Sequence, residues 1–324
     1  MKPHPIISAV DLQKKFKVTT RGHSSRLLTA LDRVSLHLST GETLGIAGES
    51  GCGKSTLAKI MAGLLMPDAG KVHYNGTPLS QLSQHEKTFF RRKTQMIFQD
   101  PFSSLNPRMR IADSISEPLK IAGMPALLQQ AELERIMSAV GLSKDAANRF
   151  PDEFSGGQRQ RIGIARALAA SPEILIADEP VSSLDISIQA QIINILLQMK
   201  IDYSLTMMIV SHNLLILRHI CDRIIIMYLG SIVECGPPAE LFKVCRHPYT
   251  EALIASIPGL HTSTAVKIVL LQDDLPSALS IPSGCRFHPR CRHAIDICRH
   301  EIPDMVEYAD GHAAACHLSN SLYG

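Results

Sequence analysis

The stretch "GESGCGKS" at residues 48–55 constrains this chain more than any other feature. It fits the pattern G-x-x-x-x-G-K-[ST], follows the apolar run "ETLGIAG", and precedes apolar residues at helical spacing. Glycines in this context let main-chain N–H groups close around phosphate oxygens, and the start of the helix adds a favourable dipole. A glycine loop that only turns a strand into a helix is the alternative, which the Lys-Ser pair disfavours. The predicted nucleotide-binding residues are Gly48, Glu49, Ser50, Gly51, Cys52, Gly53, Lys54, Ser55 and Thr56.

Three of these side chains and a downstream acidic pair have predictable roles in nucleotide chemistry. Lys54 would reach the β- and γ-phosphates, and the Ser55 hydroxyl would bind Mg²⁺. The apolar run "ILIADEP" ends in Asp178, which suits the Mg²⁺ shell, and in Glu179, which is placed to polarise an attacking water. A solvated acidic turn is the alternative for this pair. The phosphate loop upstream makes hydrolysis of a nucleotide the better interpretation.

The order of predicted elements indicates an α/β fold. From residue 95 onward a short strand, a mostly helical stretch of about forty residues and then alternating strands and helices follow one another. Such alternation predicts a mainly parallel sheet covered on both faces. The composition changes near residues 256–259, and the segment beyond is rich in Pro, His and Cys. We therefore expect one domain at residues 1–258 and a second, small one at residues 259–324, which we call the tail.

The stretch "FSGGQRQR" at residues 154–161 resembles the signature of ATP-binding-cassette (ABC) ATPases, usually LSGGQ. Ser155 can cap the helix that follows, and Gly156 and Gly157 allow the backbone to approach an anion. The resemblance implies an ABC-type P-loop NTPase core with a helical subdomain at about residues 100–165 and an antiparallel β-subdomain. It also implies that the signature, including Gln158, contacts ATP.

Other elements of the family stand in the expected order along the chain. Gln99 resembles the glutamine of the Q-loop, which senses Mg²⁺ and water, and Asp185 in "SSLD" resembles the D-loop. His212 resembles the switch histidine that contacts the γ-phosphate, and it precedes Asn213 where the family usually has Asp. Phe16 stands where the family stacks an aromatic ring on adenine. The resemblance thus implies ATP and Mg²⁺ as ligands, Glu179, His212, Gln99 and Lys54 as the catalytic set, and Ser55, Gln99 and Asp178 as the Mg²⁺ site.

One phosphate loop and one signature do not complete the family's paired site. Members of the family pair two ATPase domains head to tail, so the resemblance implies a second ATPase subunit, identical or related. ATP would close the pair, and hydrolysis would reopen it. The sequence has no run of ~18 apolar residues and no signal-peptide pattern at its start. We therefore expect a cytoplasmic chain. The resemblance implies that it works with two transmembrane permease subunits, peripheral on the cytoplasmic face of the bacterial inner membrane.

Two further stretches narrow the resemblance to one branch of the family. "RHPYTEALIASIP" at residues 246–258 and "DLPSALSIPSGCRFHPRC" in the tail resemble ATPases of dipeptide/oligopeptide importers, and "DPFSSLNPRM" is typical of the second ATPase subunit. The implied function is ATP hydrolysis that energises peptide import, with a solute-binding protein as an indirect partner. Importers of nickel, glutathione or D-alanyl-D-alanine are alternatives.

Functions outside import are less compatible with the sequence. A soluble ABC ATPase acting on ribosomes or DNA usually has two cassettes or long coiled coils, neither of which the sequence predicts. A net charge of +3 gives no argument for a nucleic-acid partner. An adaptor that binds ATP without hydrolysis is disfavoured by the presence of Glu179, Lys54 and His212.

Four cysteines gather in the tail at the spacing C-x5-C-x6-C-x17-C: Cys285, Cys291, Cys298 and Cys316. Thiols stay reduced in the cytoplasm, so a metal centre is expected before disulfides. The close pairs typical of zinc sites are absent, whereas four thiolates at looser spacing can hold a [4Fe–4S] cluster, which the resemblance also implies. Nearby histidines keep zinc as an alternative, and cysteines without metal are a third. We expect a small Cys-rich C-terminal module held together by the cluster.

Overall fold

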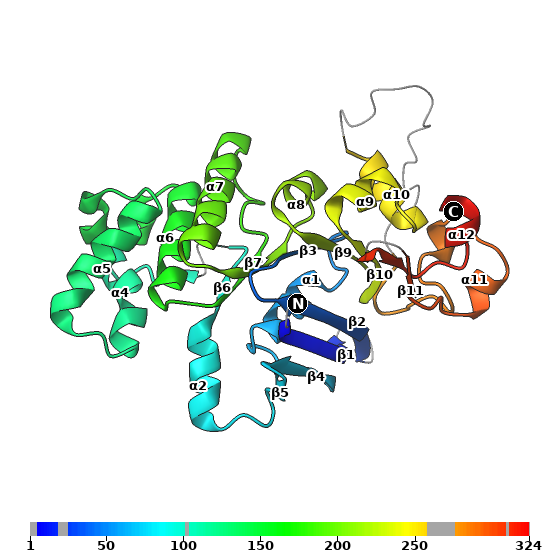
Figure 1. Cartoon of the computed structure of the whole chain (residues 1–324), viewed down its shortest axis with the longest axis horizontal. Helices are drawn as coiled ribbons and strands as arrows, with labels where there is room; N and C mark the ends of the chain where they lie inside the picture. The colour runs from blue at the N-terminus through cyan, green and yellow to red at the C-terminus, as the bar shows by residue number, and fades with distance from the viewer. Residues whose placement is uncertain (1–4, 19–24, 101–103, 258–275, 309–310, 324) are drawn as a thin grey trace.

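Two β-sheets form the scaffold of the computed structural model, which describes residues 5–18, 25–100, 104–257, 276–308 and 311–323. An eight-stranded sheet runs through the middle of the molecule, and a four-stranded sheet lies beside it (Figure 1). The helices α4, α5 and α6 form one end, and the tail forms the other. The ABC-type P-loop fold predicted from the motifs accounts for this arrangement.

The larger sheet has the order β11-β12-β10-β9-β3-β8-β7-β6. Strands β9, β3, β8, β7 and β6 are parallel, while β10, β12 and β11 run antiparallel at one edge. Continuous apolar runs form β3, β7 and β8, in which every residue is buried, as expected for parallel strands covered on both faces. The bounds are β3 Thr43–Ala47, β6 Thr94–Ile97, β7 Ile174–Asp178, β8 Thr206–Val210, β9 Arg223–Tyr228, β10 Ser231–Gly236, β11 Val306–Glu307 and β12 Ala313–Ala314.

The smaller sheet is antiparallel, with the order β2-β1-β4-β5. Its strands are β1 Pro5–Val18, β2 Arg26–Ser39, β4 Ala69–Tyr74 and β5 Thr77–Pro78. Strand-type patterns in the sequence of this region cover only about residues 6–10 and 33–38. The observed strands are longer because β1 and β2 pair with each other from Pro5 opposite Ser39 to Val18 opposite Arg26.

The larger sheet separates two hydrophobic cores. One core packs α1 and the smaller sheet against one face, with Leu44, Ile46 and Met208 pointing into it. The other packs α4, α5, α6, α7 and α8 against the opposite face, where Leu175 and Ile209 point. The predicted coverage of both faces is confirmed.

The helices are α1 Lys54–Met61, α2 Gln84–Lys93, α4 Ile111–Ile121, α5 Ala126–Ala139, α6 Gly156–Ala169, α7 Ile186–Asp202, α8 Leu214–Ile220, α9 Pro238–Lys243, α10 Pro248–Ala255, α11 Ile297–His300 and α12 Ser319–Tyr323, with short 3-10 turns η1 Lys144–Asn148, η2 Pro151–Glu153 and η3 His288–Arg290.

The described part of the tail corrects the expectation of a separate Cys-rich C-terminal module. Strand β12 pairs with β10, so the tail extends the larger sheet instead of forming a sheet of its own. Phe287 is buried in the same core as the helices of the nucleotide-binding part, and its ring packs on Tyr228 and Tyr249. The tail therefore shares the core of the nucleotide-binding part. The predicted boundary at residue 258 lies outside the described residues, and the domain division stays a prediction.

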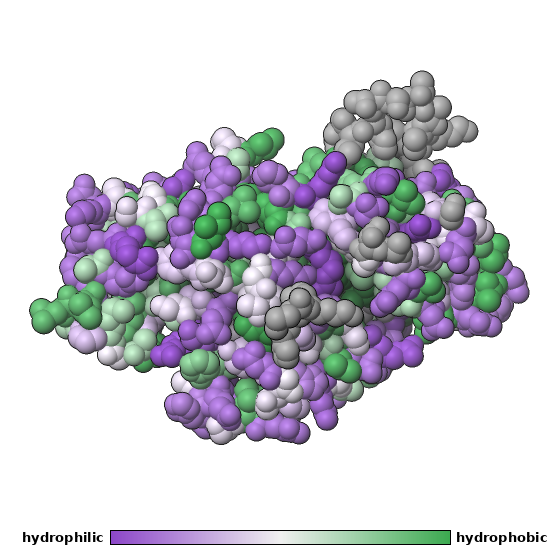
Figure 2. Space-filling view, in the orientation of Figure 1, coloured by the Kyte–Doolittle hydropathy of each residue, from purple (hydrophilic) through white to green (hydrophobic). Residues whose placement is uncertain are grey.

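Polar side chains cover most of the face shown in Figure 2, with small hydrophobic areas over the α4–α5 end and over the tail. None of the helices in the described residues has both the length and the apolar character needed to cross a membrane.

Candidate nucleotide site

The phosphate loop, residues 48–55, joins β3 to α1, and neighbouring backbone shapes it from both sides. Gly48 has φ 147°, and a Cβ there would lie 2.3 Å from the carbonyl oxygen of Met227. Gly53 has φ 106°, and its Cβ would lie 2.2 Å from the carbonyl oxygen of Ala30. Both positions need glycine because the backbone adopts the left-handed region where no side chain fits. The motif's glycines therefore fix the curvature of the loop.

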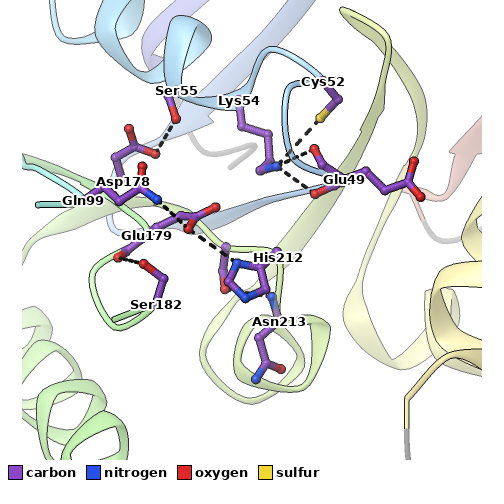
Figure 3. Close-up of polar contacts among 12 residues, drawn as sticks. Glu49, Cys52, Lys54, Ser55, Gln99, Asp178, Glu179, Ser182, His212 and Asn213 are labelled. Carbon is purple, nitrogen blue, oxygen red and sulfur yellow. Dashed lines mark hydrogen bonds and ion pairs between the residues drawn. The ribbon is translucent and has the colours of Figure 1, made fainter. Parts of the chain in front are cut away.

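Lys54 folds back over this loop. Its buried Nζ donates to the carbonyl oxygens of Gly48 at 2.7 Å and Glu49 at 2.8 Å (Figure 3). Helix α1 starts here without a side-chain cap and without an acidic residue in its first turn. A helix start of this kind attracts anions through its free N–H groups and its dipole. The ammonium and the helix start together suit a phosphate chain.

Ser55 and Asp178 form an oxygen-rich pair beside the loop. The Ser55 hydroxyl donates to Oδ1 of Asp178 at 3.0 Å. Asp178 is 3% exposed, and this burial raises the pKa of its carboxyl; the Ser55 hydrogen bond opposes the rise and the charge of Glu179 adds to it. A hydroxyl and a buried carboxylate are oxygen ligands of the type that Mg²⁺ prefers. These residues fit the predicted Mg²⁺ site.

Glu179, Gln99 and His212 converge next to Asp178, although they come from three different segments. Gln99 Nε2 donates to Oε2 of Glu179 at 3.1 Å, and the same oxygen lies 3.4 Å from Nδ1 of His212 (Figure 3). The parallel neighbours β7 and β8 end at the same edge of the sheet, which brings Glu179 and His212 together. Glu179 has φ 46° and its N–H donates to the Val210 carbonyl at 2.9 Å, which fixes where its side chain starts. A carboxylate held in this way can accept a proton from a water beside the phosphates.

The signature lines a different pocket of the same chain. Ser155 caps α6 as predicted, accepting from Gln158 N at 3.4 Å, while Gln158 Oε1 accepts from Ser155 N. Gly157 packs on α7, where a Cβ would lie 2.5 Å from Cγ2 of Ile188. With Gly141 and the helix α7, these residues line a pocket of about 460 Å³.

Three further predicted residues occupy separate places. Asp185 is exposed and precedes α7 as its N-cap residue, without a side-chain cap bond. Phe16 is partly exposed on β1, with the Lys14 ammonium 5.7 Å from its ring centroid. Asn213, which replaces the family's usual Asp, caps α8 by accepting from the N–H groups of Leu215 and Ile216.

Sequence reasoning missed two side chains that contact the phosphate loop. The Tyr249 hydroxyl accepts from the N–H of Glu49 at 2.8 Å, and the Arg290 guanidinium donates to the Glu49 carboxylate. These partners stand 200 and 241 positions away in the sequence. No local pattern signals contacts at such separations.

The tail cysteines require a correction. Burial, with the neighbouring thiols adding to it, raises the pKa of Cys285 and of Cys316 to about 11. Burial likewise raises the pKa of Cys291. Among the described residues, which include Cys298, no group of three or more His, Cys, Asp or Glu side chains is arranged to hold a metal ion. The structure therefore does not support the predicted [4Fe–4S] cluster or the zinc alternative.

Comparisons with known proteins agree with the motifs. A family model described as ABC transporter matches residues 31–182, and one described as Oligopeptide/dipeptide transporter, C-terminal region, matches residues 233–298. The chain is 46% identical to a Sinorhizobium fredii protein named as a peptide ABC transporter ATP-binding protein, y4tS, over 90% of this chain and 83% of that protein. It is 44% identical to the oligopeptide transport ATP-binding protein AppF of Bacillus subtilis over 97% of both. The dimeric post-hydrolysis structure of the ATP-binding cassette MJ0796 bound to ADP and Pi has a TM-score of 0.64 at 28% identity, over 72% of this chain and 98% of that one.

Proposed function

The chain belongs to the ABC transporter family, as an ATP-binding subunit of its oligopeptide and dipeptide importers, and from this premise we propose how its residues couple ATP hydrolysis to import. The observation that carries the proposal is the convergence of Lys54 and Ser55, at the phosphate loop, with Asp178 and Glu179, at the end of β7. Phosphate-binding, metal-binding and proton-accepting groups meet there. That combination serves hydrolysis of a nucleoside triphosphate.

Each group has a distinct task in this proposal. Lys54 and the N–H groups at the start of α1 bind the phosphates, and Ser55 and Asp178 would hold Mg²⁺, which would supply positive charge to offset that of the phosphates. Glu179 accepts the proton of the attacking water. Gln99 and His212 keep the Glu179 carboxylate directed at that water, because both contact its Oε2. Phe16 contacts adenine in this arrangement.

A complete site requires two chains. The signature lines a pocket apart from the phosphate loop. The ATP-binding cassette MJ0796, whose structure this chain resembles, is described as dimeric. We infer that Ser155, Gly156, Gly157 and Gln158 of one subunit contact ATP held by the phosphate loop of the other, with Asp185 at the same interface. ATP then favours the closed pair and hydrolysis reopens it, because each state contacts the nucleotide differently. The second subunit is an identical or a related ATPase.

An apolar groove supports a role for membrane partners. It encloses about 560 Å³ between α2, β6 and the helices α4 and α6, and residues such as Phe98, Leu105 and Ile121 line it. Because β6 leads directly to Gln99, a segment bound in the groove would sense changes at Glu179. We propose that this groove receives a segment of a transmembrane permease. Two permeases and, indirectly, a solute-binding protein complete the importer, with this chain at the cytoplasmic face of the membrane.

Substitution Glu179→Gln tests the proposed chemistry. The amide keeps the size of the side chain but accepts no proton, so we expect ATP hydrolysis to fall by at least about 100-fold while ATP affinity stays within about 2-fold of wild type. Phosphate release and equilibrium ATP binding measure the two quantities. Glu173→Gln is the matched control, because it makes the same change at an acidic residue that pairs with Lys93 at the far end of β7. Near-normal hydrolysis by Glu179→Gln would remove this residue as the base.

A further inference from the structure

The tail contacts the back of the phosphate loop through one short segment, residues 285–291, which we call the clamp segment. Arg290 donates to both carboxylate oxygens of Glu49, from Nη1 at 2.8 Å and from Nη2 at 3.1 Å. The Arg290 side chain is 4% exposed, against 26% for Glu49. A two-fold charge-assisted contact at a buried position is among the stronger polar contacts in proteins. The predicted ATP-binding position Glu49 is thus tied to a residue near the other end of the chain.

A second arginine of the clamp segment, Arg286, contacts the backbone that lies beside the phosphate loop. Arg286 bonds to the Leu229 carbonyl oxygen and to the Asp32 carboxylate. The neighbouring Gly230 N–H donates to the carbonyl oxygen of Cys52 within the phosphate loop at 2.9 Å. Arg286 therefore holds the turn between β9 and β10 against which the loop rests.

Aromatic packing fixes the position of the clamp segment. The Phe287 ring lies 5.3 Å from Tyr228, 5.5 Å from Tyr249 and 5.6 Å from His247, measured between centroids. Two of these residues also reach the contact at Glu49, because Tyr249 accepts from its N–H and Tyr228 accepts from Arg290 at 3.4 Å. The rings and the ion pair form one continuous support behind the loop.

We propose that Arg290 is a positioning residue for ATP binding: by pairing with Glu49, the clamp segment holds the phosphate loop in its binding shape and neutralises a carboxylate next to the phosphate site. The proposal rests on the ATP-binding function proposed above. It gives the tail a task in the nucleotide cycle that does not depend on a metal centre.

Two physical effects make Glu49 sensitive to this pairing. Its carbonyl oxygen accepts from Lys54, so rotation of its peptide unit would also displace the ammonium that binds the phosphates. Its carboxylate carries the same sign of charge as ATP, and an unpaired negative group beside the loop would repel the triphosphate. Pairing with Arg290 removes both problems at once. Loss of Arg290 should therefore harm binding more than loss of both charges.

The test uses the purified full chain and measures ATP affinity together with KM and kcat for hydrolysis. Arg290→Gln should weaken ATP binding about 10-fold and raise KM with kcat within about 2-fold, the range expected when a charge-assisted contact is lost. Adding Glu49→Gln to that variant should restore affinity to within about 3-fold of wild type, because the repelling charge is gone. Arg290→Lys keeps the charge but not the contact with both carboxylate oxygens. Its ATP affinity should lie between those of wild type and Arg290→Gln, about 3-fold below wild type. Arg292→Gln is the matched control, because Arg292 pairs with Glu251 at 2.7 Å and should leave ATP affinity unchanged.

The outcomes separate the inference from the function on which it rests. If the wild-type chain fails to bind ATP, the proposed function itself is wrong. If it binds ATP and Arg290→Gln binds equally well, the clamp proposal is overturned. Failure of Glu49→Gln to improve affinity at all in folded protein, judged by an unchanged melting temperature, would equally overturn it, since the unpaired Glu49 carboxylate would then not be what weakens ATP binding. Should Arg290→Gln not fold, Arg290→Lys and its pairing with Glu49→Gln give the same comparison.

Discussion

At the residue scale, the buried charge of Asp178 suits a cation but lowers the stability of the fold. Its carboxyl is buried beside Glu179, and a single hydroxyl hydrogen bond from Ser55 partly compensates. Because burial raises its pKa, the ionised form is less favourable in the folded chain than in the unfolded one. Any stability that this group contributes is present at low pH and lost as pH rises through the folded pKa.

We predict that Asp178→Asn stabilises the chain in the absence of nucleotide and abolishes Mg²⁺-dependent hydrolysis. Asparagine keeps an oxygen for Ser55 but removes the buried charge, so the free energy of unfolding should rise by about 1 kcal/mol and the melting temperature by about 2 °C at neutral pH. Scanning calorimetry and phosphate release measure the two effects. Asp113→Asn, on the exposed side of α4 and paired only loosely with Lys120 at 3.6 Å, should change neither. A less stable Asp178→Asn chain would contradict this account of the buried charge.

The same scale explains which site residues the sequence could predict. Lys54, Ser55, Asp178 and Glu179 were identifiable because chemistry dictates their spacing within short motifs, and each lies near the loop or at a strand end in the structure. Their assigned roles stay predictions. Arg290 was not identifiable, because an ion pair across 241 positions leaves no local pattern.

At the scale of elements, helix starts and apolar runs account for what was predictable. Ser155 was predicted as a cap because a hydroxyl residue precedes two glycines and a helical pattern, and it caps α6. The buried runs of β3, β7 and β8 are equally visible in the sequence. The outer halves of β1 and β2 were missed although they contain the buried Leu12 and Leu31, because the pairing that holds them in a sheet joins residues far apart in the sequence.

Helix α10 has an unusual cap with a consequence for acid stability. Nδ1 of His247 accepts from the N–H of Tyr249 at 3.0 Å, which requires a neutral ring. Complete burial lowers the pKa of His247 to about 3. Between about pH 6.5 and pH 3 the unfolded chain therefore binds a proton here that the folded chain does not, and stability falls as the solution is acidified.

We predict that His247→Asn weakens this dependence on pH. Asparagine also caps helices but does not titrate, so between pH 7.0 and 5.5 the free energy of unfolding should fall by about 1.3 kcal/mol less than in wild type. Urea unfolding at the two pH values measures the difference. His73→Asn, in β4 outside this core, controls for removing a histidine. Equal acid sensitivity of His247→Asn and wild type would show that His247 is not the responsible group.

At the scale of the whole molecule, the tail was the part least predictable from the sequence. Its composition indicated an independent module, but β12 adds to the larger sheet and Phe287 enters the main core. Cysteine spacing predicts which ligands a chain offers, whereas the arrangement of the thiols depends on how the tail packs. That packing joins the tail to the phosphate loop through Arg290 and Glu49.

The apolar groove between α2 and the α4–α6 end sets the last prediction, which concerns assembly. Ile121 lines the groove and is 77% exposed, whereas Leu127, 93% exposed at the start of α5, does not belong to its wall. An aspartate at either position meets solvent in the free chain, so stability and ATP affinity should stay at wild-type values. A charge inside the groove would, however, lose its water when a permease segment covers it, which is unfavourable.

Ile121→Asp should therefore abolish co-purification of the permease subunits with the tagged chain and reduce ATP-driven peptide uptake by reconstituted vesicles at least about 10-fold, since burying a charge in the contact weakens binding by more than about 1.4 kcal/mol. Leu127→Asp should retain both co-purification and peptide uptake, because it changes the same kind of exposed apolar side chain outside the groove. Normal assembly of Ile121→Asp would place the permease contact elsewhere. Equal loss in both variants would mean that the α4–α5 end as a whole, and not the groove, contacts the membrane subunits.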